Sequence, residues 1–197
     1  PLIAIDDDER AGASAEAASF ILCRPVGARF ERAHLAGTKL MCDALSDAIF
    51  DGADLVQAAP TDSDLTRARF RNADLSKAYF DGSTLIGADF TTAKLANTTL
   101  SATDLTGLIG LPKECHDVDF SEAVLAKQSL AKRSLKGCDF TGAQLADADL
   151  SQCDLSGADF TRANAAGVRM TQSILKDATA TGADFSRADL TGSKLDG

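Results

Sequence analysis

The sequence predicts a stacked-repeat protein, because a large apolar residue returns at nearly every fifth position from Phe30 to Leu195. A period of five fits neither the 3.6-residue period of an amphipathic helix nor the alternation of a half-buried strand. Fixed self-similarity of this kind is typical of architectures in which each unit buries its apolar face against its neighbours. All ten Phe residues, Phe20 included, keep this five-residue phase.

Other positions of the five-residue unit also keep a constant chemistry around the large apolar residue, which we call the centre. A small residue such as Ala73 lies two positions before the centre, and the residue directly before the centre is often Asp, as at Asp74. Two positions after the centre comes Gly or a polar residue, and from Phe30 onward every Gly except Gly110 has that phase. This phase predicts a turn in each unit, since Gly tolerates backbone angles that strain other residues.

The repeating unit identifies a family. Quintets such as Ala73-Asp74-Leu75-Ser76-Lys77 and Ala158-Asp159-Phe160-Thr161-Arg162 resemble the A(D/N)LXX unit of pentapeptide-repeat proteins. The resemblance implies an all-β fold, a right-handed quadrilateral (four-sided) parallel β-helix solenoid with four quintets in each coil and about eight coils in all. It does not by itself imply an activity.

The chain divides into four segments of one continuous domain. They are an N-terminal cap at 1–27, the first four coils at 28–105, an inserted segment at 106–117 and the last four coils at 118–197. In the cap we expect a short strand at Leu2–Ile5 and then an Ala-rich helix through Leu22, with the Asp-rich run at its N-terminus and Pro25 after its end. A metal site in the Asp-rich run is the disfavoured alternative. The cap would cover strand edges at the open end of the solenoid.

The length of the interruption at 106–117 decides how the columns of side chains align. If ten residues leave the wall, like residues stack throughout; if they stay, they make half a coil and the Phe residues move to the opposite side. Because stacking suits aromatic pairs, we expect 106–117 to project as a loop. The predicted columns are then Phe30, Phe50, Phe70, Phe90, Phe120, Phe140 and Phe160, and Leu45, Leu65, Leu85, Leu105, Leu135, Leu155, Leu175 and Leu195.

If residues 106–117 looped out, one column of the small positions, two residues before each centre, would contain no Ala. Its members are Asp43, Ser63, Ser83, Thr103, Arg133, Cys153, Ser173 and Ser193. Arg133 would lie one coil beyond Thr103, across the insertion. Two interpretations stay open: its guanidinium braces the loop through Asp117 or Glu114, or it extends into water.

The net charge of −9 requires a structural and a functional interpretation. The two positions after each centre hold equal numbers of acids and bases, so the excess comes from the N-terminal acids and from Asp before the centres. Asp before a centre can accept a backbone N–H in the turn. With the insertion looped out, an acidic column would also form from Asp89, Asp119, Asp139 and Asp159. The negative charge argues against direct nucleic-acid binding.

Residues for catalysis or cofactor binding are scarce. His116 adjoins Cys115, but adjacent residues rarely converge on one point, and no second Cys-His set has zinc spacing. The five Cys residues are odd in number and widely spaced, which argues against a disulfide framework, and Cys138 and Cys153 occupy small inward positions. Tyr79 alone offers no aromatic platform for single strands. We therefore predict no enzyme, no metal and no cofactor.

The sequence predicts a structural or protein–protein interaction module that acts through its rigid faces and inserted loop. The candidate interaction residues are Leu111, Pro112, Lys113, Glu114, His116 and Asp117. The alternative, which the family resemblance implies, is an acidic DNA mimic that binds and protects or inhibits a type II topoisomerase. Against it, nothing after Leu195 resembles the C-terminal helix through which such relatives dimerise.

The partner expected is a protein that the sequence does not identify. No apolar run approaches the roughly 18 residues of a membrane span, and end-to-end stacking of solenoids stays open. The chain has neither an initiator Met nor a signal peptide, so we expect a processed or trimmed start. Within the family, the bacterial cytoplasm and the thylakoid lumen both fit.

Overall fold

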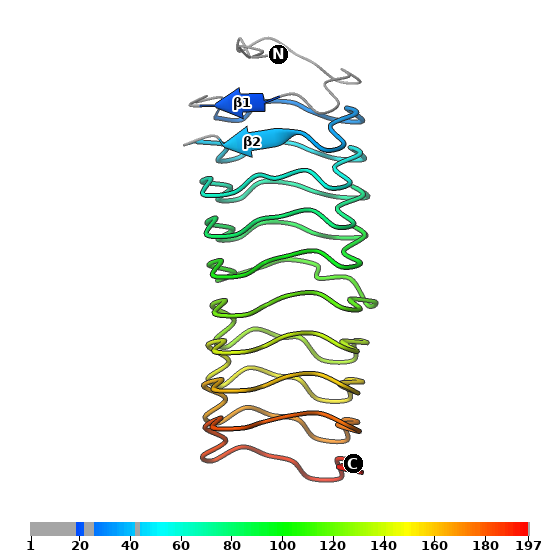
Figure 1. Ribbon diagram of the computed structural model, residues 1–197, viewed down its shortest axis with the longest axis vertical. Helices are drawn as coiled ribbons and strands as arrows, with labels where there is room; N and C mark the ends of the chain where they lie inside the picture. The colour runs from blue at the N-terminus through cyan, green and yellow to red at the C-terminus, as the bar shows by residue number, and fades with distance from the viewer. Residues whose placement is uncertain (1–18, 22–25, 42–43, 197) are drawn as a thin grey trace.

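The chain winds into a tall stack of coils, with β1 near one end of the stack and the last coil at the other (Figure 1). The computed structural model describes residues 19–21, 26–41 and 44–196, so most of the predicted N-terminal cap, together with Asp43, lies outside the described residues. The two regular strands are β1 (Ser19–Ile21) and β2 (Lys39–Met41), which pair in parallel with Phe20 opposite Leu40.

Parallel bridges between residues 20 apart join each coil to the next, as between Asp54 and Asp74 or between Asp119 and Asp139. A regular quintet contributes one bridge, at the residue before the centre, and one turn, at the two residues after it. The second turn residue takes a positive φ, for example 61° at Lys127 and 69° at Gly157. This left-handed conformation is the one that Gly adopts without strain, and it confirms the turn predicted at this phase.

Four columns of centres fill the interior, and each advances by 20 residues per coil. We name them the Phe50, Leu55, Phe140 and Leu65 columns after one buried member of each. In the Phe50 column the rings of Phe50 and Phe70 stack with centroids 5.1 Å apart and planes 5° from parallel. The small residues two positions before the centres are buried as well, so large and small side chains together fill the narrow core.

The helix expected through Leu22 is wrong where the structure describes it, because Ser19–Ile21 is the strand β1. Phe20 has the five-residue phase of the centres, which lets its backbone pair with Leu40 in β2. Ladder pairing therefore overrides the helix preference of the Ala-rich sequence before it. The described residues contain no helix, and none of them could form a membrane-crossing one.

The projecting loop expected at 106–117 is also wrong. Ile109 bridges Asp89, Glu114 bridges Ser134, and the spacing of 20 continues from Thr99 to Asp119. The ten residues 106–115 therefore stay in the wall as half a coil. The first aromatic stack ends at Phe90, and the second, from Phe120 to Phe160, lies in the column that contains Phe80.

Burial and backbone pairing explain why this segment stays in the wall. Leu111 and Cys115 are 5% and 0% exposed, and the N–H groups of Ile109 and Cys115 donate to carbonyls of neighbouring coils. Full burial of an aliphatic side chain is worth about 1.5–3 kcal/mol, whereas an aromatic pair adds about 0.5–1.5 kcal/mol beyond its burial. The free energy lost with one Phe–Phe contact is therefore smaller than the free energy that a loop would lose by exposing Leu111 and Cys115.

The other predicted columns split at the same place. In the Leu65 column, Leu105 is followed by Leu125 instead of Leu135, and the small position after Thr103 is Ala123 instead of Arg133. The acidic column loses Asp89, which bridges Ile109. Asp119, Asp139 and Asp159 remain consecutive in one ladder.

Every Asp directly before a centre accepts the backbone N–H of the residue two positions later, which confirms the turn role expected for this position. The acceptors are Asp54, Asp64, Asp74, Asp89, Asp104, Asp119, Asp139, Asp149, Asp154, Asp159, Asp184 and Asp189. These bonds stabilise the ionised form. Hydrogen bonds from Thr161 and Thr179 hold the pKa of Asp159 below its usual value, and a bond from Thr191 does the same for Asp189.

We expect the free energy of unfolding to fall as the pH drops below about 4. In the unfolded chain Asp159 and Asp189 take up protons near their ordinary pKa, whereas in the folded chain their pKa is lowered, so acid favours unfolding. Urea denaturation between pH 7 and pH 3 measures this slope. A double variant, Asp159→Asn with Asp189→Asn, should show a smaller loss, and a flat profile for the parent chain would contradict the turn role.

Candidate interaction site at the break in the repeat

The repeat is broken at residues 106–115, which we call the break, because Gly110 takes the place of a centre. Its φ is +66°, and a Cβ built there would lie 2.8 Å from Thr91 Cα, so the backbones approach too closely for any side chain. Leu111, one residue later, is buried in the core instead. Cys115 then restores the five-residue phase, again fully buried.

The hydrogen-bonded ladder opens beside the break. Within the described chain no bridge joins Lys94 to Glu114, although the coils continue on both sides. The N–H of Leu95, which by the repeat rule would donate to Glu114 C=O, has no backbone partner, and neither has the N–H of Glu114. A groove of about 400 Å³ lies here, lined by Ser76, Ala93, Lys94, Leu95, Ala96, Pro112, Lys113 and Glu114.

Arg133 braces the break from the next coil. Its Nε donates to the carbonyl of Leu111 at 3.0 Å, and Nη1 donates to the carbonyl of Ala131 at 2.9 Å. Of the two open interpretations, bracing is therefore confirmed, although the acceptors are main-chain carbonyls and not Asp117 or Glu114. A charged donor suits these carbonyls because such bonds are worth more than neutral ones.

Five of the six predicted interaction residues lie wholly or partly at the surface, and one does not. Leu111 is in the core, whereas Lys113, Glu114, His116 and Asp117 are exposed and Pro112 is partly exposed. Sequence reasoning missed Ile109, which is 52% exposed in a bridge position. The signal available was an Ile in a phase that usually carries Asp or another polar residue.

The chemical groups at the break have no catalytic arrangement. Cys115 Sγ points to the carbonyl of Pro112 at 3.3 Å, and burial raises the pKa of its thiol to about 12, so a reactive thiolate does not form. His116 Nε2 contacts both Ser134 Oγ at 2.7 Å and Glu114 Oε2 at 2.9 Å. A relay needs the acid on the other ring nitrogen.

Metal binding has no support in the part of the chain that the structure describes, because no group of three or more His, Cys, Asp or Glu side chains could hold an ion. Cys138 and Cys153 are buried in their predicted small positions, as 0% and 1% exposed side chains. Neither lies in a set of ligands.

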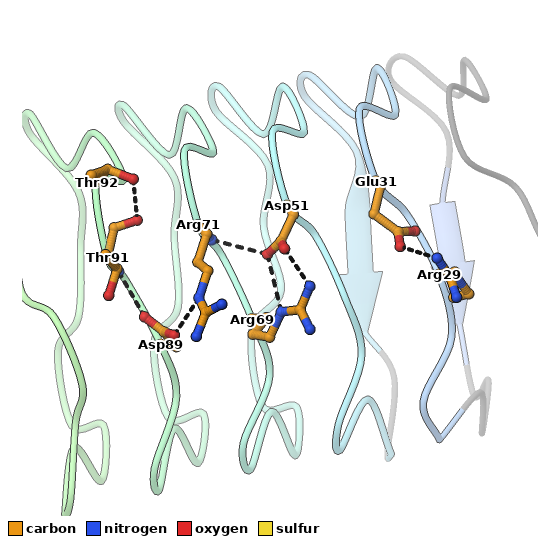
Figure 2. A network of polar contacts seen from close by, with 8 residues as sticks. All are labelled: Arg29, Glu31, Asp51, Arg69, Arg71, Asp89, Thr91 and Thr92. Atoms are coloured by element: carbon orange, nitrogen blue, oxygen red, sulfur yellow. Dashed lines mark hydrogen bonds and ion pairs between the residues drawn. The ribbon is translucent and has the colours of Figure 1, made fainter.

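Charged residues on the bridge ladder of the Phe50 column form ion pairs with charged turn residues before the break. Figure 2 shows Arg29 against Glu31 at 2.7 Å, Arg69 against Asp51, and Arg71 against Asp89 at 2.6 Å. The side chain of Asp89 is only 5% exposed. This carboxylate is therefore not available to a partner, in contrast with the role expected for the acidic column.

Bases gather around the break, although the whole chain is acidic. They are Lys94, Lys113, Lys132, Arg133 and Lys136. The acids nearby are Asp74, which pairs with Lys94 at 3.0 Å, Asp154, which pairs with Lys136 at 3.1 Å, Glu114 and Asp117. Lys113 and Lys132 have no ion-pair partner among the described residues. The surroundings of the break thus hold five bases and four acids, whereas the whole chain has an excess of acids.

The brace can be tested with Arg133→Met, which keeps an unbranched apolar stem and removes the guanidinium. Losing two hydrogen bonds to buried carbonyls should lower the free energy of unfolding by about 1–3 kcal/mol in urea denaturation. Arg162→Met is the control, because the Arg162 side chain forms no hydrogen bond or ion pair within the described residues, and it should change the free energy of unfolding by less than about 0.5 kcal/mol. Equal effects of the two variants would contradict the brace.

The five-residue repeat is also what this chain shares with known proteins. The sequence model for pentapeptide repeats matches in eight copies, over residues 44–82, 73–107, 119–157, 138–177 and 158–197. These matches leave out 108–118, which includes most of the break. No curated protein matches the chain.

Solved structures share the fold. Full-length QnrB1, a plasmid-mediated fluoroquinolone resistance protein, is 22% identical, with 95% of this chain and 93% of that chain covered and a TM-score of 0.60. HetL from the cyanobacterium Nostoc, a pentapeptide repeat protein involved in heterocyst differentiation regulation, is 28% identical, with 95% and 89% covered and a TM-score of 0.45. With its right-handed β-helix solenoid and repeats matched over most of its length, this chain belongs to the pentapeptide-repeat family.

Proposed function

We propose that this protein is a non-enzymatic interaction module that binds another protein at the break. The observation that carries the proposal is Ile109, a large apolar side chain 52% exposed on a wall whose bridge positions are mostly polar. Exposed apolar anchors with a polar rim are typical of protein interfaces. Lys113, Glu114 and His116 supply such a rim next to the groove.

The rest of the wall serves as a scaffold in this proposal. We infer a four-sided cross-section and about eight coils from the four turns of each 20-residue coil. Bridges from Ile109 to Asp89 and from Glu114 to Ser134, with continuous pairing from Thr99 to Asp119, hold the break in a fixed position. A partner therefore meets a preformed surface and loses little binding energy to ordering it.

Capture of a partner tests the role of Ile109. The immobilised chain is incubated with an extract of the cells it comes from, and the retained proteins are identified by mass spectrometry. We expect Ile109→Thr to lose the partner that the parent chain retains. Thr is found in the same phase at Thr84, Thr99 and Thr179, so this exchange suits the fold.

Ile49→Thr is the matched control, because Ile49 occupies the same phase of the same column three coils earlier. It should retain the partner, and both variants should unfold at the same temperature within a few degrees. If Ile109→Thr retains as much partner as Ile49→Thr, or if the parent chain retains no protein, binding at the break is refuted.

A second candidate is the acidic mimic that binds a type II topoisomerase, favoured by Asp119, Asp139 and Asp159 in one ladder. Their spacing of about 4.8 Å per coil gives a short row of negative charge. We rank it lower because each carboxylate already accepts a turn N–H, at 2.7–2.8 Å. The row also loses Asp89, the fourth member that the sequence suggested.

A gyrase supercoiling assay, with and without a quinolone, tests this second candidate. We expect supercoiling and drug inhibition to be unchanged by the parent chain, because the acidic row is short and tied to the turns. Inhibition or drug protection that disappears on changing Asp119, Asp139 and Asp159 to Asn would establish the mimic instead. The control changes Asp54, Asp74 and Asp154 to Asn, which are Asp residues of the same phase in the Leu55 column.

A further inference from the structure

We propose that the groove at the break binds an extended acidic segment of the partner protein, which forms main-chain hydrogen bonds where the ladder is open. The inference rests on the proposed function, because it names the chemistry of the segment that the break would bind. Three independent features of the groove support it: unpaired backbone groups, an apolar lining and flanking lysines.

The open ladder leaves main-chain groups for a partner strand. In the regular coils the N–H of each centre donates to the next coil, as Leu75 N–H donates to Lys94 C=O at 2.9 Å. Leu95 N–H, Glu114 N–H and the carbonyl of Ala93 make no such bond with another main chain in the described part of the protein. Buried backbone groups need partners, and an extended peptide supplies them in the way that an added strand pairs with a sheet edge.

The lining of the groove favours an aliphatic side chain of that peptide. Ala93, Leu95, Ala96 and Pro112 contribute apolar surface to a volume of about 400 Å³. A space of this size lies in the range of small binding pockets. In an extended segment alternate side chains point the same way, so every second residue can face the groove while the others face its rim.

The charges of the rim favour acidic residues at those other positions. Lys94 and Lys113 line the groove, and Lys132 and Lys136 lie in the next coil. The opposing acids are Asp74, Glu114, Asp117 and Asp154. Asp74 is paired with Lys94, Asp154 with Lys136, and Glu114 lies 2.9 Å from His116 Nε2. Lys113 and Lys132, unpaired among the described residues, are thus available to carboxylates of a partner.

A nucleic acid fits these observations less well than an acidic peptide. The chain carries a net charge of −9, which repels a polyanion at long range. The lining includes no aromatic side chain on which a base could stack. A peptide with a few carboxylates is repelled less than a polyanion and needs no stacking platform. It also supplies the main-chain groups that the open ladder lacks.

Fluorescence anisotropy tests the proposal directly. The probe is a fluorescein-labelled peptide of sequence Gly-Glu-Leu-Glu-Leu-Glu-Gly, titrated with the parent chain, and its analogue has Gln in place of every Glu. We expect the Glu peptide to bind and the Gln analogue to bind at least about fivefold more weakly. Binding should also weaken between about 50 and about 300 mM NaCl, because salt screens exposed charges.

Matched variants locate the site. The double change Lys113→Ala with Lys132→Ala should weaken binding of the Glu peptide about fivefold or more, whereas Lys39→Ala with Lys176→Ala, at exposed lysines of other coils, should not change it. Equal effects of the two pairs, equal binding of the two peptides, or displacement of the peptide by a dT oligonucleotide would overturn the proposal.

The peptide titration and the capture experiment can fail independently, so a failure of the acidic-segment proposal can be distinguished from a failure of the proposed function. If neither peptide binds while Ile109→Thr still abolishes capture of a protein partner, the break is an interaction site and the acidic segment is refuted. If the Glu peptide binds in the groove but Ile109→Thr retains the partner, the groove is confirmed and the role of Ile109 fails. Ile109→Thr and the double lysine variants are first compared with the parent chain by circular dichroism, so that loss of fold is recognised.

Discussion

Main-chain pairing between residues 20 apart is the constraint on which the rest of this structure depends. It sets the rise from coil to coil, it brings each centre above the equivalent centre, and it continues across the break from Thr99 to Asp119. Side-chain preferences are satisfied within that register. The two Phe stacks show this order of priority, because the change from one column to another at Phe120 costs one aromatic contact and preserves the ladder.

The core accommodates this change because packing depends on the total volume of the four centres in each coil. The coil of Phe90 has Leu95, Leu100 and Leu105 in the other three columns. The coil of Leu130 also has one ring and three Leu, but its ring is Phe140, in the opposite column. Layers of similar total volume pack equally well whichever column carries the ring. Columns of like residues are therefore a weaker rule than layers of equal size.

The sequence was sufficient for the local unit and insufficient for the alignment of units. Turn, bridge and inward positions, and the acceptor role of Asp at positions such as Asp74 and Asp159, follow from chemistry that repeats within five residues. The alignment across 106–115 depends on whether ladder pairing or aromatic stacking contributes more free energy. No pattern within five residues reveals the difference between these two contributions. The same limit hid the burial of Leu111, since a shift of one residue exchanges inside and outside.

The break has the character of a defined structure and not of a lapse in the repeat. Unpaired backbone groups cost about 1–3 kcal/mol each, and the chain surrounds them with residues that hold the opening in place. Gly110 permits an approach to Thr91 that any Cβ would prevent, Leu111 takes over the vacated core position, and Arg133 supports its carbonyl. These three features fix the backbone beside the open ladder, which is what the proposed binding at the break requires.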